Sequence, residues 1–293
     1  MTLEQLRIFV AVAEREHVTL AARDLNLTQS ATSSAVAALE ARYATKLFDR
    51  VGRRIALTEA GQLFLVEARA VLARARAAEK ILIDLAALTR GSLALAASQT
   101  VANYWLPPVL QAYRSQYPGV TIGLAIDNTE GVARRIHDGA AEIGLIEGKI
   151  DDPLLTITPF AEDELILIAP PNHPWARRAG RQPADLRQGP WVLREQGSGT
   201  RAIFEAALAR FGLAPQDLDI ALELPSNEAV CSAVAAGAGV TVVSKLVVAC
   251  ALKARVLTQV KLELPKRRFF ALHHKEYSTT RAQQALLDLI GAR

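Results

Sequence analysis

One stretch constrains the fold more than any other: residues 58–88 contain no proline, and no glycine follows Gly61. A continuous helix of this length spans roughly 45 Å at 1.5 Å per residue and is difficult to bury inside one small domain. We therefore expect it to pair with a second copy; packing within one monomer is the alternative. The predicted seam has the 3.5-residue period of a coiled coil and comprises Phe64, Ala68, Val71, Ala75, Ala78, Leu82 and Leu85.

The segment before this helix predicts a helix-turn-helix followed by a wing. Thr2 and Gln5 fit a capping box at the start of a first helix. A second, shorter helix is separated by the turn 26–28 from a third, which Thr28 caps and which runs to about Tyr43. A short helix, a tight turn and a longer helix are typical of DNA-binding proteins. The following KLFDRVGRRIALT predicts a two-stranded wing.

The third predicted helix begins with short hydroxyl side chains in LTQSATSS, residues 27–34. Short polar groups at a helix N-terminus can enter the major groove, where Gln29 can pair with an adenine edge. Residues 42–54 hold five bases and the single acid Asp49, although the net charge of the chain is only +4. An exposed polar face on an ordinary capped helix is the alternative. The predicted DNA-binding residues are Thr28, Gln29, Ser30, Ser33, Ser34, Arg50, Arg53 and Arg54.

From Gly91 onward, strands alternate with helices, which predicts mostly parallel sheets arranged in two lobes. Ligands of such folds bind where strands end and helices begin. Glu147, at the end of GLIEG, points toward the expected cleft between the lobes. Arg194 or Arg201 could neutralise an anion there, or could equally form a surface ion pair. Plain helix capping is the alternative. Four junctions carry short donors suited to a small anion: 98–100, 128–129, 197–200 and 226–227.

The sequence contains no motif for nucleophilic catalysis, dinucleotide binding, metal binding or a disulfide framework. A nucleophile elbow needs glycine two residues before and after its serine, but Ser198 has Gln196 and Thr200 there. Residues 237–239 lack the third glycine of a dinucleotide fingerprint. Cys231 and Cys250 form no metal or disulfide pattern. We therefore predict no enzymatic activity, no cofactor and no metal. The N-terminus carries no secretory signal, so the cytoplasm is expected. The alternatives are a solute-binding or enzymatic α/β domain with an accessory DNA-binding head, and a DNA-compacting protein.

Three segments together resemble the winged helix-turn-helix of LysR-type transcriptional regulators: TLEQLRIFVAVAE, VTLAARDLNLTQSATSSAVAALE and LFDRVGRRIALTEAG. Thr32 stands where that family usually has an aliphatic residue. The resemblance implies a homodimer or homotetramer that binds double-stranded operator DNA and contacts RNA polymerase. It also implies a DNA-binding domain over 1–58, a linker helix over 59–89 and a periplasmic-binding-protein-like effector domain over 90–293. Its lobe I would cover 92–162 and 267–293, and its lobe II 163–266.

The effector segments VANYWLPPVLQAYRSQYP, IGLIEG, EDELILIA and PWVLREQGSGTRAIFE resemble regulators of sulfur metabolism, including a sulfite-responsive type, and more distantly carbon-fixation regulators. We therefore predict a small sulfur oxyanion such as sulfite, with an unknown organic acid in the same cleft as the alternative. The predicted effector-binding residues are Ser98, Gln99, Thr100, Thr129, Glu147, Ser198, Gly199, Thr200, Ser226 and Asn227.

Overall fold

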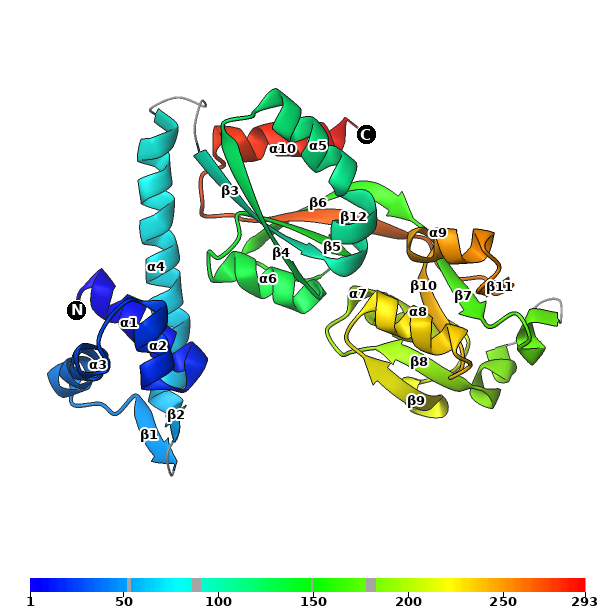
Figure 1. Cartoon of the computed structure of the whole chain (residues 1–293), viewed down its shortest axis with the longest axis horizontal. Coiled ribbons are helices and arrows are strands. Elements are labelled where there is room, and N and C mark those ends of the chain that lie inside the picture. Colours follow the sequence, from blue (N-terminus) through cyan, green and yellow to red (C-terminus); the bar gives the residue numbers. More distant parts are fainter. Residues whose placement is uncertain (52–53, 86–90, 149, 178–182, 293) are drawn as a thin grey trace. The chain divides into compact units, whose positions relative to one another are not determined.

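The structure is a computed structural model that describes every residue except 52–53, 86–90, 149, 178–182 and 293. It divides into two compact units (Figure 1). The N-terminal unit covers residues 1–85 together with 137–140, and the C-terminal unit covers the remainder. No helix among the described residues combines the length and the apolar character needed to cross a membrane.

The N-terminal unit has the predicted helices and wing. Thr2 Oγ1 accepts from the backbone N–H of Gln5 at 3.2 Å, and Gln5 Oε1 accepts from that of Thr2 at 3.0 Å, which completes the capping box. The two wing strands pair antiparallel, with Phe48 opposite Leu57. The elements are α1 (Leu3–Arg15), α2 (Val18–Asp24), α3 (Gln29–Tyr43), β1 (Phe48–Val51), β2 (Arg54–Leu57) and α4 (Glu59–Leu85).

The core of this unit corrects part of the predicted seam. Ala68 is buried in one cluster with Leu6, Phe9, Leu39 and Leu47, and Phe64 packs against that cluster. The first turns of α4 therefore cover the core of their own unit, because they bury the apolar side chains of α1, α3 and the wing from solvent. Further along the same helix Val71 is 43 % exposed and Leu82 is 71 % exposed.

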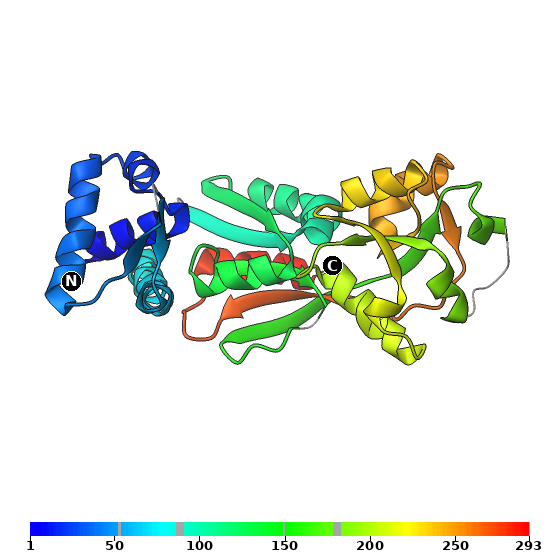
Figure 2. The ribbon, with the colours of Figure 1, turned by 90° about the horizontal axis from the view of Figure 1, so that it is seen from below.

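The first lobe of the C-terminal unit, lobe I, is a five-stranded sheet in the order β4-β3-β5-β12-β6. Strand β3 runs parallel to β4 and β5, whereas β12 runs antiparallel to both β5 and β6. Helices α5 and α10 cover one face, and α6 covers the other (Figures 1 and 2). The elements are β3 (Gly91–Ser98), α5 (Pro107–Gln116), β4 (Val120–Asp127), α6 (Thr129–His137), β5 (Ile143–Glu147), β6 (Leu155–Asp163), β12 (Arg267–His274) and α10 (Arg281–Gly291).

Lobe II contains a three-stranded sheet in the order β10-β7-β11 and a parallel pair, β8 and β9. A π-helical turn, Val101–Trp105, precedes α5 in lobe I and contacts this lobe: Asn103 Nδ2 and the Tyr104 hydroxyl donate to Glu228 Oε1 at 3.2 and 3.0 Å. The elements are β7 (Leu165–Ala169), β8 (Pro190–Arg194), α7 (Gly199–Arg210), β9 (Asp219–Leu224), α8 (Asn227–Ala235), β10 (Thr241–Ser244), α9 (Lys245–Lys253) and β11 (Thr258–Val260), with 3-10 turns at Pro174–Arg177, Pro183–Gln188 and Pro215–Asp217.

Strand direction differs in part from the prediction. Parallel pairing holds for β3, β4, β5, β8 and β9, but β7 pairs antiparallel with β10 and β11, as β12 does with its neighbours. The sequence pattern does not predict strand β6. Pro159 interrupts it, and many of its side chains are half-buried or exposed, so the usual alternation of a strand is weak. The chain passes between the lobes twice, from β6 to β7 and from β11 to β12.

Candidate functional site

Polar side chains from both lobes are buried together in the C-terminal unit. We call this set the interlobe cluster; it lies where strands end and helices begin, as predicted. Each member is at most 5 % exposed, although a buried polar residue is costly unless it is hydrogen-bonded. The members are Ser98 at the end of β3, Thr100 after it, Thr129 at the start of α6, Glu147 at the end of β5, Thr200 in α7, Asn227 in α8 and Arg267 at the start of β12.

Glu147 is the centre of the cluster. Its Oε1 accepts from the hydroxyls of Thr100 at 3.4 Å and Thr200 at 3.3 Å, which belong to different lobes. Its backbone carbonyl accepts from the hydroxyl of Thr129 at 3.3 Å. The other carboxyl oxygen, Oε2, is buried and has no hydrogen-bond partner among the described residues. Half of a buried carboxyl group is therefore left available to a ligand.

Asn227 connects lobe II to the loop that follows β3. Its Nδ2 donates to Thr100 Oγ1 at 3.3 Å, and its Oδ1 accepts from Arg194 Nη1 at 2.7 Å. Gln99 completes the connection: its Oε1 accepts from the backbone N–H of Asn227 at 2.9 Å, and its Nε2 donates to the carbonyl of Pro225 at 2.9 Å. The structure thus brings three of the four predicted junctions into one network, and Thr129 adds the fourth.

Gly199 explains how α7 approaches β5 so closely. A Cβ atom at this position would lie 2.3 Å from the carbonyl oxygen of Glu147 and 2.5 Å from Thr129 Oγ1. Real Cβ atoms do not make such contacts, so only glycine permits this packing. The close approach is therefore one of α7 to β5, and the effector-binding role of Gly199 stays a prediction.

Two predicted ligand residues act as helix caps in the structure. Ser198 Oγ accepts from the backbone N–H of Arg201 at 3.5 Å, and Ser226 Oγ accepts from that of Ala229 at 3.0 Å. Capping satisfies one of the free N–H groups of the first helical turn. The hydroxyls of Ser198 and Ser226 therefore cap helices, which is the alternative that the sequence left open. Ser98 Oγ differs from them, because it is buried and has no partner among the described residues.

Arg194 and Arg201 do not serve as free cations. Arg194 forms an ion pair with Glu195 at 2.8 Å. Arg201 pairs with Glu205 at 2.7 Å and with Glu223, and donates to the carbonyl of Arg194. Burial alone would raise the pKa of Glu195, but the hydrogen bond and charge of Arg194 outweigh it and hold that pKa below its ordinary value. Both arginines therefore follow the other alternative, an ion pair, although they are buried and not at the surface.

The residue that the sequence reasoning missed is Arg267. Its Nη1 donates to Thr200 Oγ1 at 2.9 Å, and its Nε is 2.6 Å from Asp163 Oδ2. Its Nη2 is buried and has no partner among the described residues. One signal was available: opposite charges stand directly before the segments ELILIA and FFALHH, where the chain enters and leaves lobe II.

The predicted DNA-reading residues lie together on α3. Thr28 caps the helix by accepting from the backbone N–H of Ala31 at 3.2 Å. Thr32 is fully buried and its hydroxyl donates to the carbonyl of Thr28 at 3.1 Å, so a threonine replaces the family's aliphatic residue without an unpaired polar group. Arg53 lies outside the described residues. The residues Thr28, Gln29, Ser30, Ser33 and Ser34 are all exposed, and Arg50 and Arg54 belong to β1 and β2.

Glu40 holds the wing against α3. Its Oε1 accepts from the backbone N–H groups of Leu47 at 2.8 Å and Phe48 at 3.2 Å, and its Oε2 pairs with Lys46 at 2.9 Å. Burial acts to raise the pKa of Glu40, but these contacts outweigh it and leave the pKa below its ordinary value. The wing is therefore fixed relative to the helix that the sequence predicts to read DNA.

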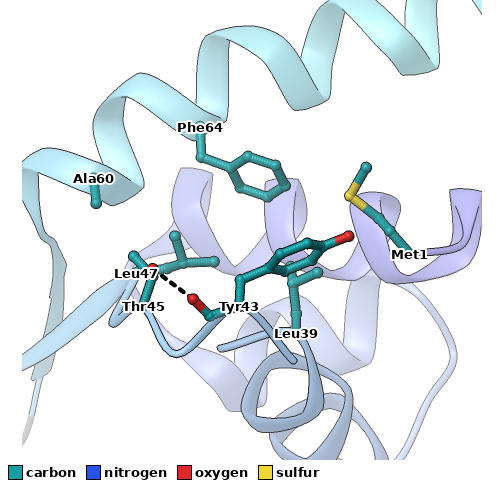
Figure 3. Close-up of a pocket in the computed structure, with 7 residues that line it drawn as sticks. All are labelled: Met1, Leu39, Tyr43, Thr45, Leu47, Ala60 and Phe64. Atoms are coloured by element: carbon teal, nitrogen blue, oxygen red, sulfur yellow. Dashed lines mark hydrogen bonds between the residues drawn. The ribbon is translucent and has the colours of Figure 1, made fainter. Parts of the chain in front are cut away.

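An apolar pocket of about 330 Å³ opens between the end of α3 and the start of α4 (Figure 3). Figure 3 shows Phe64 and Tyr43 facing each other across it, with the hydroxyl of Thr45 donating to the carbonyl of Tyr43 at 3.0 Å. The lining residues are Met1, Leu39, Tyr43, Thr45, Leu47, Ala60 and Phe64. Phe64 of the predicted seam therefore borders both the core and this pocket.

The chain matches known proteins over its whole length. A family profile described as "LysR substrate binding domain" matches residues 86–293, and one described as "Bacterial regulatory helix-turn-helix protein, lysR family" matches residues 3–62. The HTH-type transcriptional regulator YeiE of Escherichia coli strain K12 is 36% identical over 293 residues, covering 98% of this chain and 96% of that protein. A probable RuBisCO transcriptional regulator of Cyanidioschyzon merolae is 37% identical over 265 residues, covering 89% and 88%.

Solved structures of related fold superimpose on this chain. The CbnR structure in complex with its target DNA superimposes with a TM-score of 0.69 at 23% identity, covering 99% of both chains. The regulatory domain of Synechocystis CcmR in complex with 2-PG gives a TM-score of 0.64 at 27% identity, covering 69% of this chain and 97% of that one. The chain therefore belongs to the LysR family, as a DNA-binding transcriptional regulator with an effector-binding domain and not as an enzyme.

Proposed function

We propose that this regulator senses a small anionic effector in the interlobe cluster. One observation carries the proposal: Ser98 Oγ, Glu147 Oε2 and Arg267 Nη2 are buried polar atoms without a partner among the described residues. Buried polar groups in native proteins are almost always paired. A ligand that presents both donors and acceptors would satisfy all three, and the network through Thr200 already connects Glu147 to Arg267.

The donors favour a small oxyanion or a short carboxylate. Hydroxyls, an amide and one guanidinium surround the site, whereas aromatic walls typical of flat apolar ligands are absent from the interlobe cluster. The relative CcmR was solved with 2-PG, which supports a small effector in this domain. We infer that the unpaired hydroxyl of Ser98 donates to the ligand, and that Thr100, Thr129 and Thr200 hold it when their hydroxyls donate to the anion instead of to Glu147. The surrounding loops are shaped by Gln99, Ser198, Gly199, Ser226 and Asn227.

Glu147 further limits which anions the site can bind. An ionised carboxylate repels a fully ionised anion, but it accepts a hydrogen from a protonated one. Sulfite takes up a proton near neutral pH and sulfate does not, so sulfite in its hydrogen-bearing form suits this site better. A short organic acid that carries a hydroxyl group is the second candidate, because its hydroxyl could donate to the same Glu147 oxygen.

Calorimetry with the full-length protein tests the proposal. The removal of one donor to an anion costs about 1.5–3 kcal/mol, so Thr100→Val should weaken sulfite binding roughly tenfold or more. Thr258→Val, on β11 and outside the interlobe cluster, is the matched control and should bind like the wild type. The absence of any heat with sulfite, sulfate or thiosulfate at millimolar concentration would refute the oxyanion. Unchanged affinity in Thr100→Val would refute the site instead.

The N-terminal unit carries the DNA-binding function of the regulator. We propose that residues 1–58 bind operator DNA through α3 and the wing, and that 90–293 form the effector domain. The linker helix predicted over 59–89 is α4 as far as Leu85, and its last four residues lie outside the described residues. The exposed Val71 and Leu82 support a seam with a second copy, giving a homodimer or homotetramer that holds two half-sites together. Regulation in the cytoplasm with a contact to RNA polymerase completes the proposal.

A further inference from the structure

Arg267 and Asp163 form a buried ion pair at the place where the chain passes between the lobes. Asp163 is the last residue of β6, Arg267 is the first residue of β12, and the two face each other in the antiparallel register. The Arg267 Nε and Asp163 Oδ2 atoms are 2.6 Å apart, and the side chains are only 2 % and 1 % exposed. Such a pair survives burial only with good geometry and further hydrogen bonds.

The second oxygen of Asp163 is also held. Its Oδ1 accepts from Ser244 Oγ at 2.7 Å, and Ser244 is the last residue of β10 in lobe II. The carboxylate therefore cannot rotate without loss of one of its two partners. Because Arg267 is planar and rigid, an anchored Nε fixes the direction of the remaining donors as well.

The Arg267 guanidinium has one donor group left for a ligand. Nε is engaged by Asp163 and Nη1 by Thr200, whose hydroxyl also donates to Glu147. Nη2 has no partner among the described residues. Arg194 and Arg201, the other buried arginines of the described part of the C-terminal unit, form ion pairs with acidic neighbours.

We propose that Arg267 recognises the negative charge of the effector, and that Asp163 positions Arg267 and limits how much negative charge the site accepts. This inference rests on the proposed function. Two carboxyl groups, Glu147 and Asp163, stand against the single guanidinium of Arg267, so the formal charge of the three is −1 with both acids ionised. Each further negative charge on the ligand is repelled by this net negative charge, and the repulsion is strong because the site is buried in a region of low dielectric. The site therefore favours a singly charged ligand over a doubly charged one.

Titration calorimetry of the full-length protein tests this with sulfite and sulfate, at a pH where sulfite is mostly singly protonated. Arg267→Lys should weaken both anions at least tenfold, because one ammonium cannot hold Asp163, Thr200 and a ligand in a planar fork. Asp163→Asn should shift the ratio of the sulfate and sulfite affinities about tenfold toward sulfate, since it removes one negative charge that repels the dianion more.

The neighbouring pair Arg268 and Glu162 provides matched controls. It lies next to the buried pair in the same two strands, but its side chains are 61 % and 64 % exposed. Arg268→Lys and Glu162→Gln should leave both affinities unchanged. A purely structural role for Asp163 would weaken both anions equally and leave their ratio at the wild-type value, so the ratio separates the two explanations.

The outcomes are distinct. Wild-type affinity in Arg267→Lys overturns the role of Arg267, while binding by the wild-type protein leaves the proposed function standing. An unchanged ratio in Asp163→Asn overturns the charge limit. If Asp163→Asn does not fold, Ser244→Ala keeps the charge and frees one carboxylate oxygen; it should weaken both anions without a change in ratio, and wild-type affinity would overturn the positioning role. If the wild-type protein binds neither anion, the oxyanion proposal fails and the inference fails with it.

Discussion

The replacement of Gly199 by alanine gives the sharpest test of how the lobes meet. The new methyl group would lie 2.3 Å from the backbone oxygen of Glu147 and 2.8 Å from its Cγ. A backbone carbonyl at the end of the inner strand β5 cannot move aside as the end of a flexible side chain can. Overpacking of this kind typically costs about 1–3 kcal/mol. In a unit of this size 1 kcal/mol lowers Tm by roughly 2–4 °C, so we expect a fall of about 2–12 °C.

Differential scanning calorimetry of the full-length protein measures this fall, and the transition of the N-terminal unit serves as an internal reference. Gly123→Ala is the matched control, because Gly123 lies in β4 and a Cβ there meets no atom within 4 Å. We also expect weaker sulfite binding in Gly199→Ala, since α7 must move away from Glu147 and take Thr200 with it. Equal Tm values for the two alanine variants would show that the close approach of α7 to β5 does not exist in solution.

Three further predictions concern the DNA interface, the assembly and the cysteines. Gln29→Ala should cost about 1–3 kcal/mol at one operator base pair and little on random DNA in fluorescence anisotropy; equal losses on both would exclude base reading. Leu82→Glu should dissociate the oligomer in sedimentation velocity, because Leu82 is 71 % exposed on a helix face that needs a partner; an unchanged sedimentation coefficient would remove Leu82 from the seam. Partial burial raises the pKa of Cys231 to about 12, so at pH 7 iodoacetamide should label the exposed Cys250 much faster. Comparable labelling rates by mass spectrometry would contradict the partly buried placement of Cys231.

The helices and the wing of the N-terminal unit were predictable because each carries local signals. Thr2, Thr28 and the proline-free stretch 58–88 act through neighbours a few residues away, and capping and periodicity are local properties. The seam was predicted less well, because periodicity shows that Phe64 and Ala68 share a face but does not show what covers it. That depends on α1 and α3, which pack there in the folded unit.

The interlobe cluster was predictable only in part, for the same reason. The hydroxyl and amide residues stand at strand ends, a position that the alternating pattern reveals. Arg267 and Asp163 are 104 residues apart, and their pairing depends on the antiparallel register of β12 with β6, a strand that the pattern did not predict. For Arg194 and Arg201 the sequence left an ion pair open, and the acidic partners are partly local: Glu195 follows Arg194 directly, and Glu205 lies one turn after Arg201 in α7. Glu223, in β9, depends on packing that the sequence does not state.

The position of β12 has a consequence for synthesis. This strand lies between β5 and β6 in the middle of the lobe I sheet, yet it begins only at Arg267 and is followed by a single helix, α10. The ribosome therefore releases the complete DNA-binding segment and all of lobe II before lobe I can close. Sheet closure across so long a separation is slow. A chain that ends before Arg267 would contain the complete DNA-binding segment and lobe II, but the sheet of lobe I would lack β12 and the interlobe cluster would lack its guanidinium.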